Sequence, residues 1–99
     1  GWFPDYSDAD NYLTPFFLTE NFLGNHFSDA QTEELILAQA VETDPDTRTQ
    51  MIEDIQSRVA ELLSTLPLLQ GAQVAVAGTD VDGVILDASF KLRFAPITK

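Results

Sequence analysis

The sequence predicts an α+β fold in which two to three helices are followed by short strands within a single domain of 99 residues. Three observations support this prediction. Apolar residues recur at helical spacing between Ser28 and Thr65. Residues 68–94 hold short apolar runs separated by turn residues, as strands do. No helical pattern alternates with these runs, so the order of elements does not indicate a parallel sheet.

Three helices are expected in the first two thirds of the chain. Thr14 and Pro15 are an N-cap and a first helical residue, and the apolar face of this helix would consist of Phe16, Phe17, Leu18 and Phe22. Ser28 and Gln31 fit a capping box that begins a second helix running to about Glu42. Its expected buried stripe consists of Leu35, Ile36, Ala38, Ala40 and Val41.

The third helix has the strongest pattern. Asp44 and Pro45 are a typical N-cap and first helical residue. The helix should end near Thr65, because Pro67 disfavours helical geometry in the residue before it. The apolar residues at helical spacing are Met51, Ile52, Ile55, Val59, Leu62 and Leu63.

The last third of the chain predicts strands at 68–77, 84–86 and 90–94, with the turn-rich residues 78–83 after the first of them. Phe90, Leu92 and Phe94 alternate with Lys91 and Arg93, which is typical of a half-buried strand.

Composition excludes several classes of function. Asp and Glu outnumber Lys and Arg by 16 to 5, for a net charge of −11. Phosphate binding needs clustered Lys and Arg, so neither a nucleic acid nor an anionic membrane surface is an expected partner. The chain has no Cys, which excludes disulfides and thiolate zinc sites. Its apolar runs are all shorter than the roughly 20 residues of a membrane span.

Candidate catalytic and metal-binding residues are few. His26 is the only histidine, and no nucleophile motif accompanies it, so we expect no enzymatic turnover. Asp5, Asp8, Asp10 and Asn11 could offer oxygen ligands to calcium, as could Asp80 and Asp82, but both runs lack the remaining ligands of a known loop. Turns are the favoured interpretation of both runs, and neither a metal nor a cofactor is expected.

One segment has a more specific pattern. Residues 1–13 read GWFPDYSDADNYL and resemble the W-x-x-D-Y-x-D-x-D-N-(aromatic)-L stretch of the solute-binding proteins that serve oligopeptide, dipeptide and nickel ABC importers (extracellular solute-binding protein family 5). Further similarities follow in the family's order. They are Asn25–Ser28, Leu35-Ile36 with Ala40, Asp44 with Arg48, Ile55-Gln56, Leu66–Leu68 and Val81–Val84.

The resemblance implies that residues 1–99 are the C-terminal segment of a larger two-lobed solute-binding protein, as a partial lobe of a type II periplasmic-binding-protein-like fold. The implied function is capture of a solute, most simply a peptide, outside the cytoplasm, either in a periplasm or lipid-anchored at the outer face of the membrane. The implied partners are the rest of that protein and the ABC permease subunits.

The implied ligand-binding residues are Trp2, Phe3 and Asp5. By the resemblance, Asp5 pairs with the peptide's α-ammonium group, Trp2 borders the ligand pockets, and the backbone of Phe3 contacts an extended peptide. The alternative is that Asp5 caps a turn and that the chain is a free-standing acidic α+β protein-interaction domain.

Overall fold

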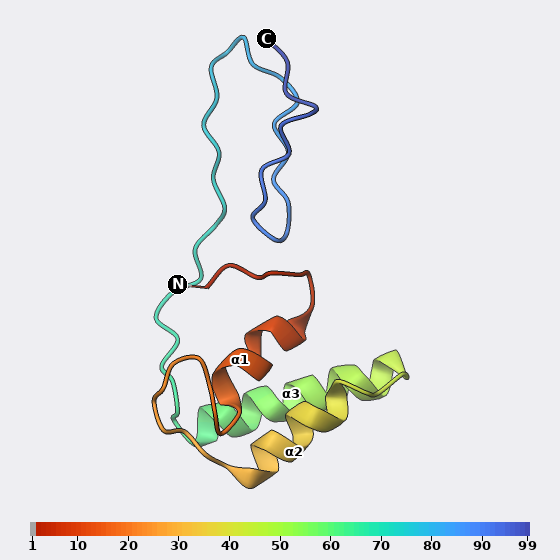
Figure 1. Ribbon diagram of the computed structural model, residues 1–99, viewed down its shortest axis with the longest axis vertical. Coiled ribbons are helices and arrows are strands. Elements are labelled where there is room, and N and C mark those ends of the chain that lie inside the picture. The colour runs from red at the N-terminus through yellow and green to blue at the C-terminus, as the bar shows by residue number, and fades with distance from the viewer. Residues whose placement is uncertain (1) are drawn as a thin grey trace. The chain divides into compact units, whose positions relative to one another are not determined.

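The computed structural model describes residues 2–99, which form two compact units. One unit is Asp8–Leu68, and the other consists of residues 2–7 together with Leu69–Lys99. All the helices that the structure describes lie in the first unit, which we call the helical unit (Figure 1). They are the 3-10 helix η1 (Ala9–Tyr12) and the α-helices α1 (Thr14–Phe17), α2 (Ala30–Gln39) and α3 (Pro45–Glu61).

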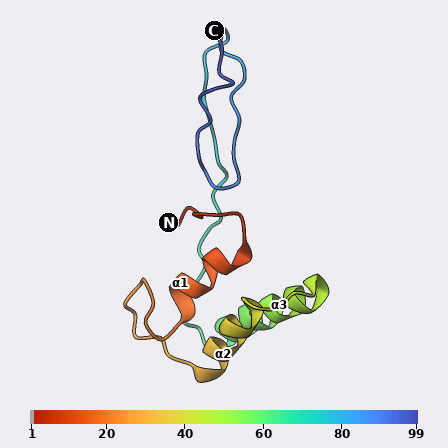
Figure 2. The same ribbon diagram turned by 45° about the vertical axis from the view of Figure 1, so that its right-hand side comes forward.

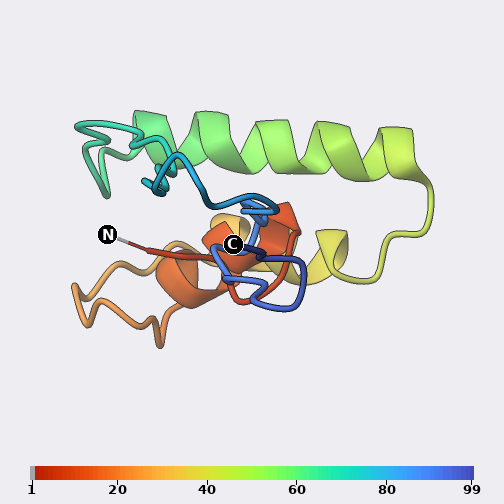
Figure 3. The same cartoon turned by 90° about the horizontal axis from the view of Figure 1, so that it is seen from above.

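The core of the helical unit lies where α2 and α3 pack together. After a short connection, α3 runs back alongside α2, as Figure 3 shows. Ile36 and Ile55 are fully buried there, and Leu13 and Val59 are nearly so. Phe17, Leu18, Leu35 and Ile52 pack against them. None of the helices described in residues 2–99 has the length and apolar character needed to cross a membrane.

The start of α3 confirms the sequence-based prediction. Asp44 is the N-cap, its carboxylate accepts a hydrogen bond of 2.8 Å from the Thr47 amide, and Pro45 follows at the first turn. The helix ends at Glu61, a few residues earlier than predicted. Leu63 then adopts a left-handed conformation with φ of 51°, which ends the helix. As a result the side chain of Leu63 is exposed, although helical spacing predicted that it is buried.

The predicted second helix exists, but with different boundaries. Its N-cap is Asp29 and not Ser28, because the Asp29 carboxylate accepts the Thr32 amide at 2.8 Å. It ends at Gln39, so Ala40 and Val41 of the expected stripe are exposed. The face that α2 buries is partly polar, and its fully buried residues are Thr32, Ile36 and Gln39.

The first predicted helix is a single turn. α1 begins at Thr14 itself, after Leu13 in the N-cap position, and ends at Phe17 because Leu18 is extended with ψ of 160°. The Asn21 side-chain amide donates to the Leu18 carbonyl at 3.1 Å and supports this exit from the helix. Phe22, which was expected on the apolar face, is exposed.

The α+β prediction is wrong, because the regular secondary structure in residues 2–99 is helical and no strand forms there. The predicted strands 68–77, 84–86 and 90–94 are extended chain and turns, shown in Figure 2 as a trace without arrows. Two isolated antiparallel bridges, Asp82 with Thr98 and Leu86 with Leu92, are the only pairing in the described part of the chain. The prediction of a partial lobe of a type II periplasmic-binding-protein-like fold required these strands, so it is wrong as well.

The physical reason is that an apolar run becomes a strand only when a neighbouring strand bonds its backbone. Residues 65–78 have no such neighbour among the described residues. Leu68, Val74 and Val76 are therefore exposed, Val76 to 95%. In the alternating run, Phe90 interrupts the extended chain with φ of 59°. Residues 62–79 also contain no charged side chain, so this exposed stretch is apolar and neutral in a strongly acidic chain.

One turn in the second unit requires glycine. Gly83 has φ of 75°, and a Cβ atom there would lie 2.0 Å from the carbonyl oxygen of Pro96. This close approach lets Asp82 and Thr98 exchange two backbone hydrogen bonds of 3.0 and 3.1 Å. The interpretation of Asp80 and Asp82 as turn residues is consistent with this, since the Val81 amide donates to the Gly78 carbonyl and Lys99 forms an ion pair with Asp80.

Candidate functional site

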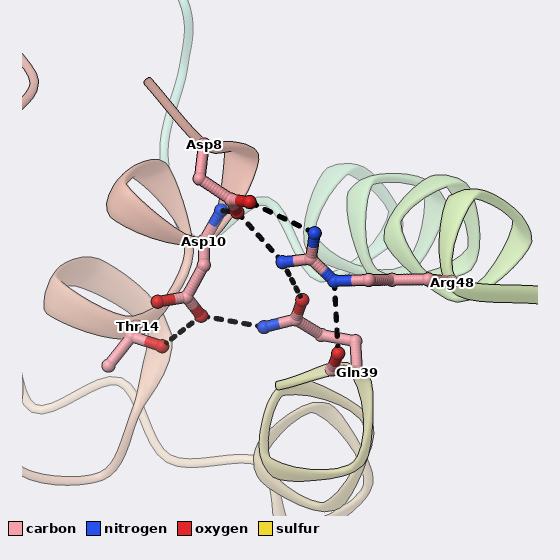
Figure 4. Close-up of polar contacts among 5 residues, drawn as sticks. All are labelled: Asp8, Asp10, Thr14, Gln39 and Arg48. Carbon is pink, nitrogen blue, oxygen red and sulfur yellow. Dashed lines mark hydrogen bonds and ion pairs between the residues drawn. The ribbon is translucent and has the colours of Figure 1, made fainter. Parts of the chain in front are cut away.

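An ion pair within the helical unit joins the motif that carries the family resemblance to α3. Asp8 is the N-cap of η1, and its side chain accepts the Asp10 amide at 2.8 Å. The two terminal nitrogens of Arg48 donate to its two carboxylate oxygens at 2.8 and 2.9 Å (Figure 4). Such a bidentate contact fixes the orientation of both groups as well as their distance.

Gln39 completes the network from the end of α2. Its side chain is fully buried. Arg48 Nε donates to the Gln39 carbonyl at 3.1 Å, and Arg48 Nη2 donates to Gln39 Oε1 at 3.0 Å. Gln39 Nε2 donates to Asp10 at 2.6 Å, and the Thr14 hydroxyl donates to the same carboxylate oxygen at 2.6 Å (Figure 4). We call these five residues, Asp8, Asp10, Thr14, Gln39 and Arg48, the anchor network.

The electrostatics of the anchor network favour its charged form. The hydrogen bonds from Arg48 and then from the Asp10 amide hold the pKa of the Asp8 carboxyl below its usual value. The Asp8 carboxylate in turn raises the pKa of the Arg48 guanidinium. Asp8 and Arg48 are about one third exposed, with side-chain exposures of 34% and 28%, so the pair lies at the edge of the core. The network therefore holds η1, α2 and α3 together by directed polar contacts.

A second ion pair joins α3 to the start of α2. Arg58 Nε and Nη2 donate to the two carboxylate oxygens of Asp29 at 2.6 and 2.8 Å. Asp29 also accepts the Thr32 hydroxyl at 2.7 Å, and these contacts lower the pKa of the Asp29 carboxyl, with the Arg58 hydrogen bond as the largest cause. This pair is bidentate like that of Arg48 with Asp8, although Arg58 uses Nε and Nη2 where Arg48 uses Nη1 and Nη2, and it does not involve residues 1–13.

The predicted ligand-binding residues share one segment, Trp2–Asp5, in the second unit. Trp2 is half-buried, Phe3 is exposed to 64%, and the side chain of Asp5 is exposed. The Phe3 ring contacts the Phe90 ring at a centroid distance of 4.8 Å, and Lys91 Nζ donates to the Asp5 carbonyl at 3.2 Å. The side chains of Phe3 and Asp5 are thus both exposed within one short segment.

The remaining candidates from the sequence do not gather into a site. His26 is exposed and adopts φ of 57°, as a loop residue. Asp8 and Asp10 direct their carboxylates at the partners in the anchor network. Within residues 2–99, no three His, Asp or Glu side chains converge in a way that could hold a metal ion.

An apolar cavity of about 440 Å³ opens on the helical unit between the α1 region and α3. No charged residue is among those that line it, which are Ala9, Tyr12, Leu13, Phe17, Ile52, Gln56, Val59, Ala60, Thr65 and Pro67. Leu66 and Leu68, which follow the lining residue Thr65 in the chain, are exposed. The cavity is therefore part of a neutral, apolar surface on an acidic chain.

Sequence reasoning missed the roles of Gln39 and Arg48. Gln39 was absent from the predicted buried stripe because a polar residue on an amphipathic helix is expected to face solvent. The available signal was a periodic one, since Thr32, Ile36 and Gln39 follow helical spacing. Comparison with known proteins gave no match: no family model fits the chain, and neither curated proteins nor solved structures include a significantly similar one.

Proposed function

We propose that the chain is part of an extracytoplasmic solute-binding protein that captures a peptide, or a similar small solute, for an ABC importer. The observation that carries this proposal is that some residues of the motif 1–13 build the helical unit, whereas others have exposed side chains. In the helical unit, Asp8 is the N-cap of η1, Asn11 is a buried polar residue and Leu13 is part of the core. The preceding Phe3 and Asp5 remain exposed and offer an aromatic surface and a carboxylate to a ligand.

The chemistry of this segment suits the amino terminus of a peptide. A carboxylate binds an ammonium ion through charge-assisted hydrogen bonds, which strengthen as water is excluded. An exposed aromatic side chain in the same segment can also attract a cation. Pro4, between Phe3 and Asp5, is buried and has no backbone N–H, so it offers a ligand no hydrogen-bond donor.

The proposed partners are the rest of the binding protein, the permease subunits and the solute. The exposed apolar surface supports this proposal, because isolated soluble proteins rarely expose large neutral patches. Leu66, Leu68 and Leu69 are each exposed to 78% or more, and the apolar cavity lies on the same unit as Leu66 and Leu68. Further chain of the same protein is the covering that the proposal requires.

The direct test is a titration of the protein, with the remainder of its chain, against tripeptides built from alanine, leucine or lysine. Each peptide is supplied with a free and with an acetylated amino terminus. Calorimetric binding of the free peptides and much weaker binding of the acetylated ones is the expected result, because acetylation removes the ammonium group that Asp5 would bind. Failure of every free peptide to bind would contradict the proposal for this ligand class.

A second candidate function is a protein-interaction module, which the neutral cavity and the exposed leucines also favour. This candidate makes no use of the Asp5 carboxylate. The two are separated by the same titration, since an interaction module has no reason to distinguish a free peptide amino terminus from an acetylated one.

A further inference from the structure

The segment 3–5 is held by a turn of its own unit. The Phe3 ring packs against the Phe90 ring at a centroid distance of 4.8 Å, which is typical of favourable aromatic pairs. Lys91 Nζ donates to the Asp5 carbonyl at 3.2 Å. One short stretch of chain therefore contacts the segment at both of its ends. We propose that Phe90 is a positioning residue for the ligand-contacting segment 3–5.

The turn that carries Phe90 is fixed by Asp87. The Asp87 carboxylate accepts the Ser89 amide at 2.8 Å and the Ser89 hydroxyl at 2.6 Å. Arg93 donates to the other carboxylate oxygen at 2.6 and 3.0 Å. The Phe90 amide in turn donates to the Asp87 carbonyl at 2.8 Å. The backbone from which the Phe90 ring projects is therefore ordered by several directed contacts.

Phe90 occupies a backbone region that aromatic residues seldom adopt. Its φ of 59° is left-handed, where a Cβ atom is crowded and where glycine or asparagine is favoured. Other residues persist in this region only when surrounding contacts hold them there, and such residues gather at functional sites. The ring contact with Phe3 is an interaction that neither glycine nor asparagine could make from this position.

These contacts hold the segment and leave its side chains exposed. Phe3 remains 64% exposed, and Lys91 bonds the backbone of Asp5. Pro4 is buried between them, and its ring fixes φ, so the segment has little internal freedom. A binding group that is ordered before the ligand arrives loses less conformational entropy on binding. This ordering is how Phe90 would raise the affinity of Asp5 for a ligand ammonium group.

This inference rests on the proposed function, because positioning matters only if the segment binds a ligand. Phe90→Asn removes the ring but suits the left-handed turn, since asparagine adopts this region more readily than most residues do. The turn should therefore persist in this variant. Phe90→Tyr keeps the ring and is the conservative variant.

The matched control is Phe94→Asn. Phe94 lies in the same unit, its side chain is exposed to 72%, and it makes no ring contact with Phe3 within residues 2–99. This substitution therefore removes an exposed aromatic ring without touching the segment 3–5. A difference between the two asparagine variants reports the contact with Phe3 and not the loss of an apolar side chain.

Trp2 supplies a readout that needs no ligand, because it is the only tryptophan in the 99 residues and directly precedes Phe3. In the 99-residue chain, at a temperature where every variant is folded by circular dichroism, Phe90→Asn should raise the quenching of Trp2 by acrylamide. Phe90→Tyr and Phe94→Asn should leave the quenching as in the wild type. Equal quenching in Phe90→Asn and the wild type, or an equal rise in Phe94→Asn, would overturn the inference.

The second arm measures affinity by calorimetry for the tightest-binding tripeptide of the set above, in the protein with the rest of its chain. Phe90→Asn should lower the affinity by about tenfold or more, and Phe94→Asn should not. The loss should shrink in an Asp5→Asn background, because a positioning residue has less effect once the group that it positions is gone. Equal losses in both backgrounds, or no loss in either, would contradict positioning.

The two arms separate failure of the proposed function from failure of this inference. If the wild type binds no tripeptide, the proposed function fails and the segment has no ligand of this class. A rise in Trp2 quenching confined to Phe90→Asn would still show that Phe90 holds the segment. Unchanged Trp2 quenching would instead remove the positioning role, whether or not the peptides bind.

Discussion

Arg48 and Asp8 lie forty positions apart in the chain, and two hydrogen bonds of 2.8 and 2.9 Å join them. Asp8 is the N-cap of η1 and Arg48 lies in the first half of α3, so the contact joins two segments that are separated in the chain by α1 and α2. Because Gln39 of α2 contacts both Arg48 and Asp10, the three elements meet at one polar cluster. The helical unit is thus held by an apolar core and by a buried amide beside it.

Replacement of Gln39 by leucine should destabilise the helical unit despite the added apolar surface. Leucine cannot donate to Asp10 or accept from Arg48, so both charged groups would lose a partner at the edge of the core. Leaving buried polar groups unsatisfied costs about 1–3 kcal/mol, and more for charged groups. Urea unfolding followed by circular dichroism measures this cost. Gln70→Leu, at an exposed position, is the control and should shift the free energy of unfolding by less than about 0.5 kcal/mol.

Asp5→Asn should weaken binding of peptides that have a free amino terminus. The substitution keeps the shape of the side chain but removes the charge that would neutralise the ligand ammonium group. Truncation of one member of such a pair lowers affinity by about thirtyfold to several thousandfold. Calorimetry with free and acetylated peptides isolates the effect, because the acetylated peptide has no ammonium group to leave unpaired. Equal affinity of Asp5→Asn and wild type for free peptides would show that Asp5 is only a turn residue.

The stability of the helical unit should fall at acidic pH. The pKa values of Asp8, Asp29 and Asp44 are all lowered in the folded chain, chiefly by Arg48, by Arg58 and by the Thr47 amide respectively. Their stabilising effect is therefore fully present above the ordinary carboxyl pKa of 3.8 and is lost as the pH falls below it.

Urea midpoints should accordingly be steady between about pH 7 and about pH 5 and should drop below about pH 4. Asp29→Asn removes the carboxyl that accepts hydrogen bonds from both Arg58 and Thr32, so its curve should fall less steeply in the acidic range. A wild-type midpoint that rises on acidification would contradict the sign of all three shifts.

The 99-residue chain should associate with itself at high concentration. Leu68 and Val76 are exposed to 84% and 95% within a stretch that contains no charged side chain. Nothing in that stretch opposes contact between two copies, although the net charge of −11 repels them at long range. Light scattering should therefore show oligomers that increase with salt, because salt screens the repulsion.

The double substitution Leu68→Lys with Val76→Lys should shift the chain towards monomer. Gln70→Lys adds a single positive charge to the same stretch but removes no apolar side chain, so it should reduce association less. A monodisperse wild-type monomer at high concentration, with cooperative unfolding, would argue that the exposed stretch needs no covering chain.

Local sequence determined the part of this protein whose interactions are local. Asp44 and Pro45 begin α3 because a cap and a fixed φ act within one turn, and the spacing of Ile55 and Val59 places them on one buried face. Local sequence also predicted α2, but it indicated Ser28 as the N-cap where the structure has Asp29. Both residues can cap a helix, and the contact of Asp29 with Arg58, which lies far along the chain, distinguishes them.

Tertiary structure decided everything that depends on distant partners. Nothing near Arg48 in the sequence indicates Asp8 as its partner. Helical spacing aligns Gln39 with Thr32 and Ile36, but only packing between elements decides that this polar face is the buried one. The apolar runs after Pro67 had the composition of strands, yet a strand exists only when a neighbour bonds its backbone. The described residues supply no such neighbour, so these runs remain extended and exposed, and the fold is helical where α+β was expected.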